Sequence, residues 1–217
     1  MKHIYPSLMV VENENITREI EKLDSYCAGF HLDVMDGKFV LPTMWNDARI
    51  LQKIIARIDR VWLHLMVEKP DEFYRQISLP SGSLVSFHIE SEVDVFDFSK
   101  QIIEKTHKVS LAIRPKTPVS EIVPFLHVLD QVLVMSVDPG YSGQHFLKSS
   151  FDKIEELIDL RTQLNANYTI GVDGGINAEN ITELARAGVT EYAVATGIFG
   201  KVDHLAALQE LHVLSDI

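Results

Sequence analysis

The sequence lacks the features that mark several classes of protein. It has one cysteine, Cys27, among 217 residues, so it cannot form an internal disulfide. Basic residues are also few: 20 Lys and Arg stand against 31 Asp and Glu, which gives a net charge of −11. Such a charge repels a polyphosphate backbone or an anionic membrane at long range, so we expect no nucleic-acid and no membrane partner.

Long apolar segments are missing as well. The longest apolar runs, such as residues 132–137, are far shorter than the ~20 residues that cross a bilayer. No stretch near the N-terminus combines basic residues, an apolar run and a cleavage site, so the sequence predicts a cytoplasmic protein. There is no low-complexity tract and no Pro/Ser-rich linker, and 46% of the residues are hydrophobic. We therefore expect one domain over residues 1–217.

What the sequence does contain is an alternation of short β-rich runs with segments of helical periodicity. Eight runs predict strands, at residues 4–9, 29–34, 61–66, 84–89, 109–113, 131–137, 168–172 and 191–195. Between them, apolar residues recur three and four apart, and Asn177 and Gly188 mark the expected start and stop of one helix. The alternation is typical of parallel βαβ units. It favours the α/β class and a single (β/α)8 TIM barrel, with an open doubly wound sheet as the structural alternative.

Polar side chains gather where three of the expected strands end. His31 and Asp33 share one face of the second strand, His64 lies on the third, and Asp173 follows the seventh. Active sites of barrels are built at the carboxyl ends of the strands. A carboxylate that faces a barrel interior is costly unless it binds a metal or moves protons. Two imidazoles and two carboxylates suit Zn²⁺, the ion we favour, or Fe²⁺, Mn²⁺ or Co²⁺ rather than Ca²⁺.

Other residues compete for the same role. His88 and Glu90 have the i, i+2 spacing of His31 and Asp33, so spacing alone leaves this pair open as a rival site. A single histidine is more often a hydrogen-bonded structural residue than a ligand, and we interpret the remaining ones in that way: His3, His107, His127, His145, His204 and His212. Three methionines on or just after the expected strands are typical of core packing and would equally give a metal site a dry lining: Met35, Met66 and Met135.

Glycine-rich turns follow the sixth, seventh and eighth strands. They are Val137-Asp138-Pro139-Gly140-Tyr141-Ser142-Gly143-Gln144, Gly174-Gly175 and Ala195-Thr196-Gly197. Glycine lets backbone N–H groups approach a phosphate closely, and the loops after strands seven and eight often bind phosphate in barrels. Such a site needs no lysine cluster, which reconciles an anionic ligand with an acidic protein.

At these residues the chain resembles the ribulose-phosphate 3-epimerase family, from Pro6-Ser7 to Phe199-Gly200. The segments that carry the resemblance are HLDVMDGKFV, HLMVEKP, VLVMSVDPGYSGQHF, GVDGG and ATGIF. The resemblance implies a divalent metal on His31, Asp33, His64 and Asp173, with the two aspartates doubling as an acid/base pair. The same resemblance implies a substrate site that includes Ser7, His64, Met35, Met66, Met135, Gly140, Tyr141, Ser142, Gly143, Gly174, Gly175, Ala195 and Thr196.

Some positions depart from the family pattern. The second loop has Leu41-Pro42-Thr43-Met44-Trp45-Asn46 where Pro-Asn is common, and the fifth strand ends in Arg114-Pro115-Lys116-Thr117-Pro118 instead of Asn-Pro-Gly-Thr-Pro. Ala195-Thr196 replaces a glycine-serine pair, and Gly171 stands where the family often has Glu. None of these removes a proposed ligand, but we expect Trp45, Arg114 and Lys116 near the mouth of the site.

The resemblance implies epimerisation at C3 of a ketose phosphate through an enediolate, with one aspartate on each face of the carbon. D-ribulose 5-phosphate to D-xylulose 5-phosphate, a step of the pentose phosphate pathway, is the first hypothesis, and a related phosphoketose such as D-allulose 6-phosphate is the alternative. A non-catalytic sugar-phosphate-binding barrel is the alternative from another class. A related decarboxylase barrel is disfavoured because residues 64–66 lack its Asp-x-Lys-x-x-Asp motif. A small-molecule sugar phosphate and a homo-oligomer are the expected partners.

Overall fold

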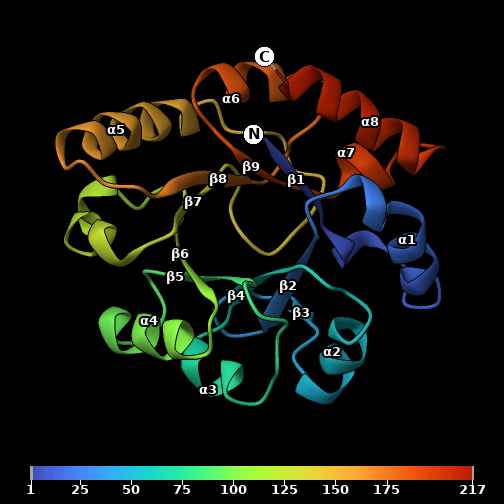
Figure 1. Ribbon diagram of the computed structural model, residues 1–217, viewed down its shortest axis with the longest axis horizontal. Coiled ribbons are helices and arrows are strands. Elements are labelled where there is room, and N and C mark those ends of the chain that lie inside the picture. The colour runs from blue at the N-terminus through green and yellow to red at the C-terminus, as the bar shows by residue number, and fades with distance from the viewer. Residues whose placement is uncertain (1, 217) are drawn as a thin grey trace.

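The computed structural model describes residues 2–216, and a nine-stranded sheet forms its centre. Apart from the short antiparallel β3 (Thr43–Met44), its strands are all parallel, eight in number, and they curl into a ring in the order β1-β9-β8-β7-β6-β5-β4-β2 (Figure 1). An isolated parallel bridge between Ser7 and His31 joins the two ends of this order. The parallel strands are β1 (His3–Pro6), β2 (Phe30–Asp36), β4 (Val61–Met66), β5 (Leu84–His88), β6 (Lys108–Ile113), β7 (Gln131–Met135), β8 (Thr169–Asp173) and β9 (Glu191–Val194).

Helices surround this ring on the outside (Figure 1). They are α1 (Ile16–Leu23), α2 (Ala48–Ile55), α3 (Pro70–Tyr74), α4 (Val95–Glu104), α5 (Ser150–Gln163), α6 (Ile181–Arg186), α7 (Thr196–Phe199) and α8 (His204–Ser215). Aspartate side chains cap three of them by accepting backbone N–H groups: Asp47 at α2, Asp94 at α4 and Asp203 at α8. Within residues 2–216, no helix has the length and apolar character needed to cross a membrane.

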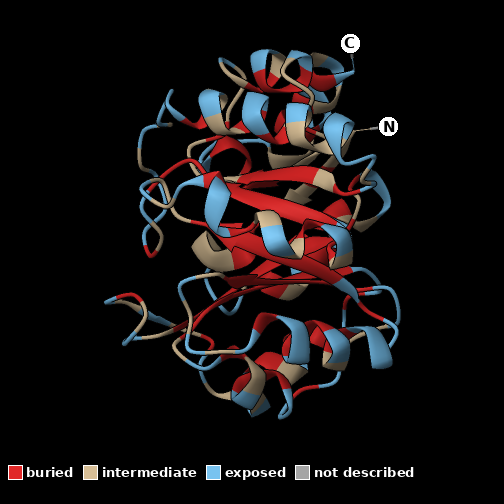
Figure 2. Ribbon diagram, turned by 90° about the vertical axis from the view of Figure 1, so that its left-hand side faces the viewer, coloured by how far each residue is buried: buried red, intermediate tan, exposed pale blue. Residues whose placement is uncertain are grey.

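The sheet is buried on both faces, as its near-continuous apolar strands predict (Figure 2). On the outer face, the strands pack against the apolar sides of the helices; in α5, for example, Ile154 and Leu157 are fully buried. On the inner face, the floor of the barrel is filled by a second cluster that includes Trp62, Leu133 and Ala193. The barrel is therefore a packed core, and space for a ligand is left at its carboxyl end.

A chain of hydrogen bonds crosses the floor of the barrel. Trp62 Nε1 donates to Ser86 Oγ (2.7 Å), Ser86 donates to Ser110 Oγ (2.7 Å), and Ser110 donates to Gln131 Oε1 (2.6 Å). Gln131 in turn donates to Glu191. Every polar group in this row thus has a partner, which removes the cost of burying it.

The expected fold class is confirmed, since eight parallel strands alternate with helical segments around a ring. Strand β4 has the predicted limits, and the other strands shift by a few residues at their ends. Two connections differ from the regular pattern. Between β6 and β7 the chain forms the 3-10 helices η3 (Val119–Glu121) and η4 (Val123–Val128), and after β2 it adds β3, which is too short to predict from periodicity.

Two predicted element limits were wrong. The first strand ends at Pro6 because the next residues turn into the 3-10 helix η1 (Leu8–Val10), so Met9 does not lie on the strand. Helix α6 begins at Ile181 with Asn180 as its N-cap, rather than at Asn177. The two asparagine side chains instead accept backbone N–H groups of the turn before the helix, Asn180 from Asn177 N at 3.0 Å and Asn177 from Glu179 N at 2.8 Å.

Candidate active site

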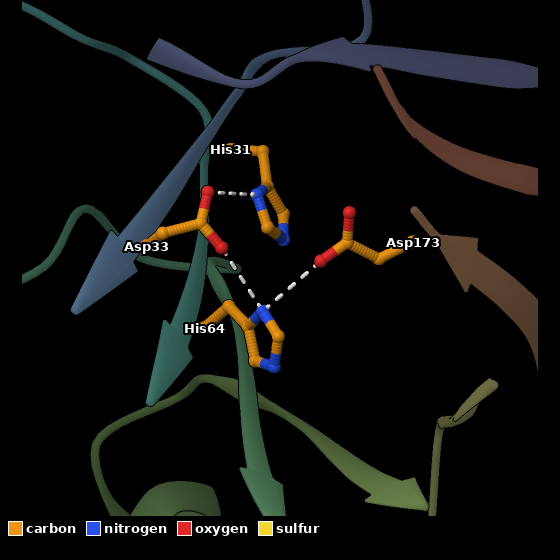
Figure 3. Close-up of side chains that lie close together, drawn as sticks. All are labelled: His31, Asp33, His64 and Asp173. Atoms are coloured by element: carbon orange, nitrogen blue, oxygen red, sulfur yellow. Dashed lines mark hydrogen bonds and ion pairs between the residues drawn. The ribbon is translucent and has the colours of Figure 1, made fainter. Parts of the chain in front are cut away.

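Four titratable side chains converge at the carboxyl end of the barrel. His31 and Asp33 come from β2, His64 from β4 and Asp173 from β8, and one ligand-type atom of each lies within 4.8 Å of all the others (Figure 3). His64 Nδ1 lies 3.1 Å from Asp33 Oδ1 and 3.3 Å from Asp173 Oδ2. In Figure 3 the two dashed contacts leave this nitrogen in a V, one toward Asp33 on β2 and one toward Asp173 on β8. Alternation along β2 and the parallel register Asp33–His64 bring the cluster together.

The cluster has the donor set and the geometry to hold a divalent metal ion. His31 Nδ1 lies 3.1 Å from Asp33 Oδ2, but His31 Nε2 is buried without any hydrogen-bond partner. An orphaned ring nitrogen is costly in a protein interior and is accounted for if it binds an ion. Two imidazoles and two carboxylates suit zinc and related first-row metals. Among residues 2–216 this is the one group of three or more His, Cys, Asp or Glu found in such an arrangement.

Electrostatics within the cluster favour charged forms. Burial alone would raise the pKa of Asp33, but the charge of His31 and hydrogen bonds from His31 and His64 outweigh it, so the pKa lies well below its usual range. Burial alone would lower the pKa of His64, but contacts with Asp173 and Asp33 outweigh burial and raise it to about 9. Ser7 Oγ also donates to Asp33 Oδ2 at 2.6 Å. Asp33 is thus held as an ionised, firmly oriented carboxylate.

A cavity opens above the cluster. Its wall contains both aspartates, three buried methionines from β2, β4 and β7, and backbone from the loops after β7, β8 and β9. The lining residues are Met9, Asp33, Met35, Met66, Met135, Val137, Pro139, Gly140, Tyr141, Ser142, Gly143, Gln144, Asp173, Gly174, Gly175, Ile176, Ala193, Ala195 and Thr196. No lysine or arginine is among these lining residues of the described chain. An anion bound there would depend on backbone N–H groups, on neutral donors such as the Ser142 and Thr196 hydroxyls, and on the metal.

Glycines let the three loops pack closely along one side of this cavity. Gly175 has φ +64°, and a Cβ on it would lie 2.6 Å from the backbone nitrogen of Phe146. A Cβ on Gly174 (φ +116°) would lie 2.4 Å from Val137 Cγ2. Both positions therefore need glycine for conformation and for space. The close packing brings the backbone of the loops after β7 and β8 to one wall, beside Thr196 at the start of α7.

Two residues assigned to the substrate site do not line the cavity. Ser7 is 1% exposed and lies behind Asp33, to which it donates, and His64 is fully buried below the carboxylates. Conversely, six residues line the cavity without being among the predicted site residues: Met9, Val137, Pro139, Gln144, Ile176 and Ala193. Met9 lies in η1, just past the first strand, and Gln144 lies at the end of the quoted loop motif, where its Nε2 donates to Asp138 O (2.7 Å) and Tyr141 O (2.9 Å).

The rival pair His88 and Glu90 is not part of the cluster. His88 is fully buried and reaches the cluster only through His64, since the two Nε2 atoms lie 3.0 Å apart. Most of the other histidines have partners elsewhere; His107, for example, lies 2.6 Å from the Tyr74 hydroxyl, and His204 lies 2.7 Å from Glu19 Oε2.

The three departures that we expected at the mouth do not line the cavity. Trp45 is 9% exposed and packs into the core outside the barrel ring, and Lys116 is exposed. Arg114 lies over the Phe39 ring, 4.0 Å from its centroid, and donates to the Phe39 carbonyl at 2.8 Å. It therefore ties the loop after β6 to the loop after β2 without facing the ligand space.

The fold and the site together define a class: a (β/α)8 barrel that can hold a metal ion beneath a glycine-lined cavity. A family model described as the ribulose-phosphate 3 epimerase family matches residues 3–199. A ribulose-phosphate 3-epimerase of Aquifex aeolicus is 36% identical over 185 residues, covering 85% of this chain and 83% of its own. One from Treponema pallidum is 32% identical, with 89% of each chain covered. The chain belongs to the ribulose-phosphate 3-epimerase family.

Solved structures support the fold alone. KGPDC from Streptococcus mutans superposes with a TM-score of 0.70 at 7% identity, covering 99% of this chain and 97% of its own. A 3-hexulose-6-phosphate synthase from Salmonella typhimurium gives a TM-score of 0.68 at 12% identity, covering 99% of this chain and 98% of its own. Identities this low carry no information about substrate.

Proposed function

We propose that this protein interconverts D-ribulose 5-phosphate and D-xylulose 5-phosphate, with residues 1–217 forming one catalytic domain. The observation that carries the proposal is the placement of Asp33 and Asp173, which come from well-separated strands, both contact His64 Nδ1 and both line one cavity (Figure 3). Inversion at a carbon beside a ketone needs a base on one face and an acid on the other. Membership of the epimerase family supports the same reaction.

The side chains divide the chemistry between them. In one direction Asp33 starts ionised and takes the C3 proton on one face, while Asp173 starts protonated and gives its proton to the other face. The reverse reaction starts from the opposite pattern, with Asp173 ionised and Asp33 protonated. Ser7 keeps the Asp33 carboxylate in place through its hydrogen bond. A divalent metal on the four-residue cluster, for which zinc is our first choice, would supply Lewis-acid stabilisation of the negative charge that develops on substrate oxygens.

The wall of the cavity can exclude water from the reacting carbon and can bind the substrate phosphate. Met35, Met66 and Met135 are at most 2% exposed and give the reacting carbon a dry surrounding. Excluding water strengthens the electrostatic contacts and prevents loss of the reactive intermediate. We place the substrate phosphate against the backbone of Gly143, Gly175 and Thr196, on the far side of the cavity from β2 and β4.

The activity is tested directly on metal-loaded protein. We expect conversion of D-ribulose 5-phosphate to D-xylulose 5-phosphate, and in heavy water we expect the product to carry deuterium at C3. The same assay with D-allulose 6-phosphate measures the preference for chain length, and a higher kcat/KM for that hexulose phosphate would replace the pentulose assignment. Absence of turnover on every phosphoketose, with the metal bound, would favour a non-catalytic binding protein.

The phosphate position predicts the effect of a change at Gly175. Gly175→Leu forces a side chain into the space of Phe146 N and pushes the two loops apart. We expect KM to rise by about tenfold or more, the scale of losing one hydrogen bond to a charged group. Steady-state kinetics measure it.

Gly82→Leu is the matched control for this change. Gly82 has a similar backbone angle, φ +77°, but a Cβ there meets nothing within 4 Å, and the residue lies away from the cavity. It therefore reports backbone strain alone. Equal KM values for the two variants would show that the substrate phosphate does not bind at this wall of the cavity.

A further inference from the structure

His64 uses its two ring nitrogens for different purposes. Its Nδ1 faces Asp33 and Asp173 in the cluster, and its Nε2 lies 3.0 Å from Nε2 of His88. The two rings are stacked, with centroids 5.1 Å apart and planes at 24°, and both side chains are fully buried. The hydrogen on this Nε2–Nε2 contact must therefore belong to one ring, and the other ring must accept it.

The contact with Glu90 determines which ring accepts the hydrogen bond between the two Nε2 atoms. His88 Nδ1 lies 3.2 Å from Glu90 Oε2. Because an ionised carboxylate can only accept a hydrogen bond, His88 carries its hydrogen on Nδ1. Burial disfavours a second proton on the ring, which leaves the His88 Nε2 lone pair free to accept from His64. His64 then holds its hydrogen on Nε2. When an ion binds, it displaces the proton that the two carboxylates hold on Nδ1, and His64 keeps the hydrogen on Nε2, which is the form that a metal requires.

The carboxylate is itself fixed in place. Glu90 Oε1 accepts from the backbone nitrogen of Arg114 at 3.0 Å and from the Thr117 hydroxyl. On its other side, the His88 ring is covered by Phe39, with centroids 4.8 Å apart. These contacts form a row of three side chains, Glu90, His88 and His64. The loop after β6 fixes its Glu90 end, and the two aspartates of the cluster fix its His64 end.

We propose that His88 and Glu90 are positioning residues: they fix the tautomer of His64 and so set the affinity of the cluster for its metal. The inference rests on the metal site proposed above. Outer partners that orient a ligating histidine typically change metal affinity by about 10- to 100-fold. Without His88, the Nε2–H of His64 has no acceptor, and the two carboxylates favour the hydrogen on Nδ1, where it competes with the ion.

The experiment measures zinc dissociation constants by competition with a chromophoric chelator on stripped and refilled protein. In His88→Phe, a flat ring keeps the packing against Phe39 but cannot accept a hydrogen bond. We expect its dissociation constant to rise by about 10- to 100-fold. His88→Gln, whose amide oxygen can accept from His64, should recover part of the loss. Glu90→Gln should also raise the zinc dissociation constant. Because the Glu90 side chain is partly exposed, this variant provides the test if His88→Phe does not fold.

The matched control is His107→Phe. It removes another buried imidazole, one that contacts Tyr74 away from the cluster, and should leave the zinc affinity unchanged. Nitrogen-15 chemical shifts of His64 in the zinc-loaded protein report the tautomer directly and should show hydrogen on Nε2 in the wild type.

The outcomes separate the two proposals. Wild-type zinc affinity in folded His88→Phe and Glu90→Gln, together with loss of zinc in His31→Leu, overturns the positioning role and leaves the metal site standing. Failure of the wild-type protein to bind zinc, or full binding by His31→Leu, overturns the site and the positioning role together. A shift pattern with the His64 hydrogen on Nδ1 in the zinc-loaded protein also overturns the positioning role.

Discussion

Asp173→Asn and Asp33→Asn should each lower kcat by at least about a hundredfold, the usual lower bound for general acid–base catalysis. Asparagine keeps the size of the side chain and one oxygen that can face the metal, but it cannot exchange a proton. Asp33 and Asp173 lie to the left and right of the site in Figure 3, and the proposed mechanism gives each of them one face of the substrate carbon, so each variant should lose transfer on one face only. Steady-state rates of both variants measure the effect.

Exchange in heavy water distinguishes the two faces. A variant that lacks one carboxylate should still exchange the substrate's C3 proton through the remaining aspartate while forming no epimer. Metal content is measured on the same samples, because both aspartates belong to the cluster. Asp138→Asn is the control: Asp138 is an exposed carboxylate at the same end of the barrel that does not line the cavity. Near wild-type epimerisation by either metal-loaded cluster variant would end the two-aspartate mechanism.

The second large effect is expected at His31. Its Nε2 is the buried atom without a partner, and its ring packs edge-on against Trp62 with centroids 4.9 Å apart. His31→Leu fills the space but removes a direct ligand, so metal affinity should fall by more than the ~100-fold that loss of an outer partner causes. Turnover should be lost with the metal. Elemental analysis after dialysis against a chelator measures occupancy.

Met66→Leu is a suitable companion to His31→Leu. Met66 lines the same cavity beside the cluster but contributes none of the four ligands, and leucine nearly preserves its volume. It should retain the metal. If folded His31→Leu retained full occupancy and activity, the ion would bind elsewhere, and His88 with Glu90 would become the next site to test.

The cluster could be anticipated from sequence because it depends on strand periodicity. His31 and Asp33 are two residues apart on a strand, and strand ends of a barrel meet at one rim, so their convergence with His64 and Asp173 follows from the fold. What His88 contacts could not be anticipated. Its spacing to Glu90 matches that of His31 to Asp33, and only the barrel's curvature sets one pair at the cavity and the other behind His64.

The positions that depart from the family pattern also have contacts that the sequence could not predict. The position of Arg114 in the sequence suggested that it faces the mouth of the site. Its side chain instead lies over the Phe39 ring, in a loop 75 residues away along the chain. Gly171 is explained by space: a Cβ there would lie 2.7 Å from Gln131 Nε2 and 3.0 Å from Trp62. The neighbouring Glu191, paired with Gly171 in the ladder, supplies a carboxylate to the barrel floor instead. The periodicity of one strand cannot predict that the neighbouring strand supplies the carboxylate.

The single bridge between Ser7 and His31 gives the barrel a seam, because every other pair of neighbouring parallel strands shares at least three register positions. The cluster spans this seam. Two of its strands, β2 and β4, lie on one side, and β8 lies on the other, beyond β9 and β1. A bound ion would therefore fasten the two edges of the ring to each other. Binding of the ion would then stabilise the closed barrel, and backbone amides along the seam should exchange with solvent faster in the ion-free protein than in the loaded one.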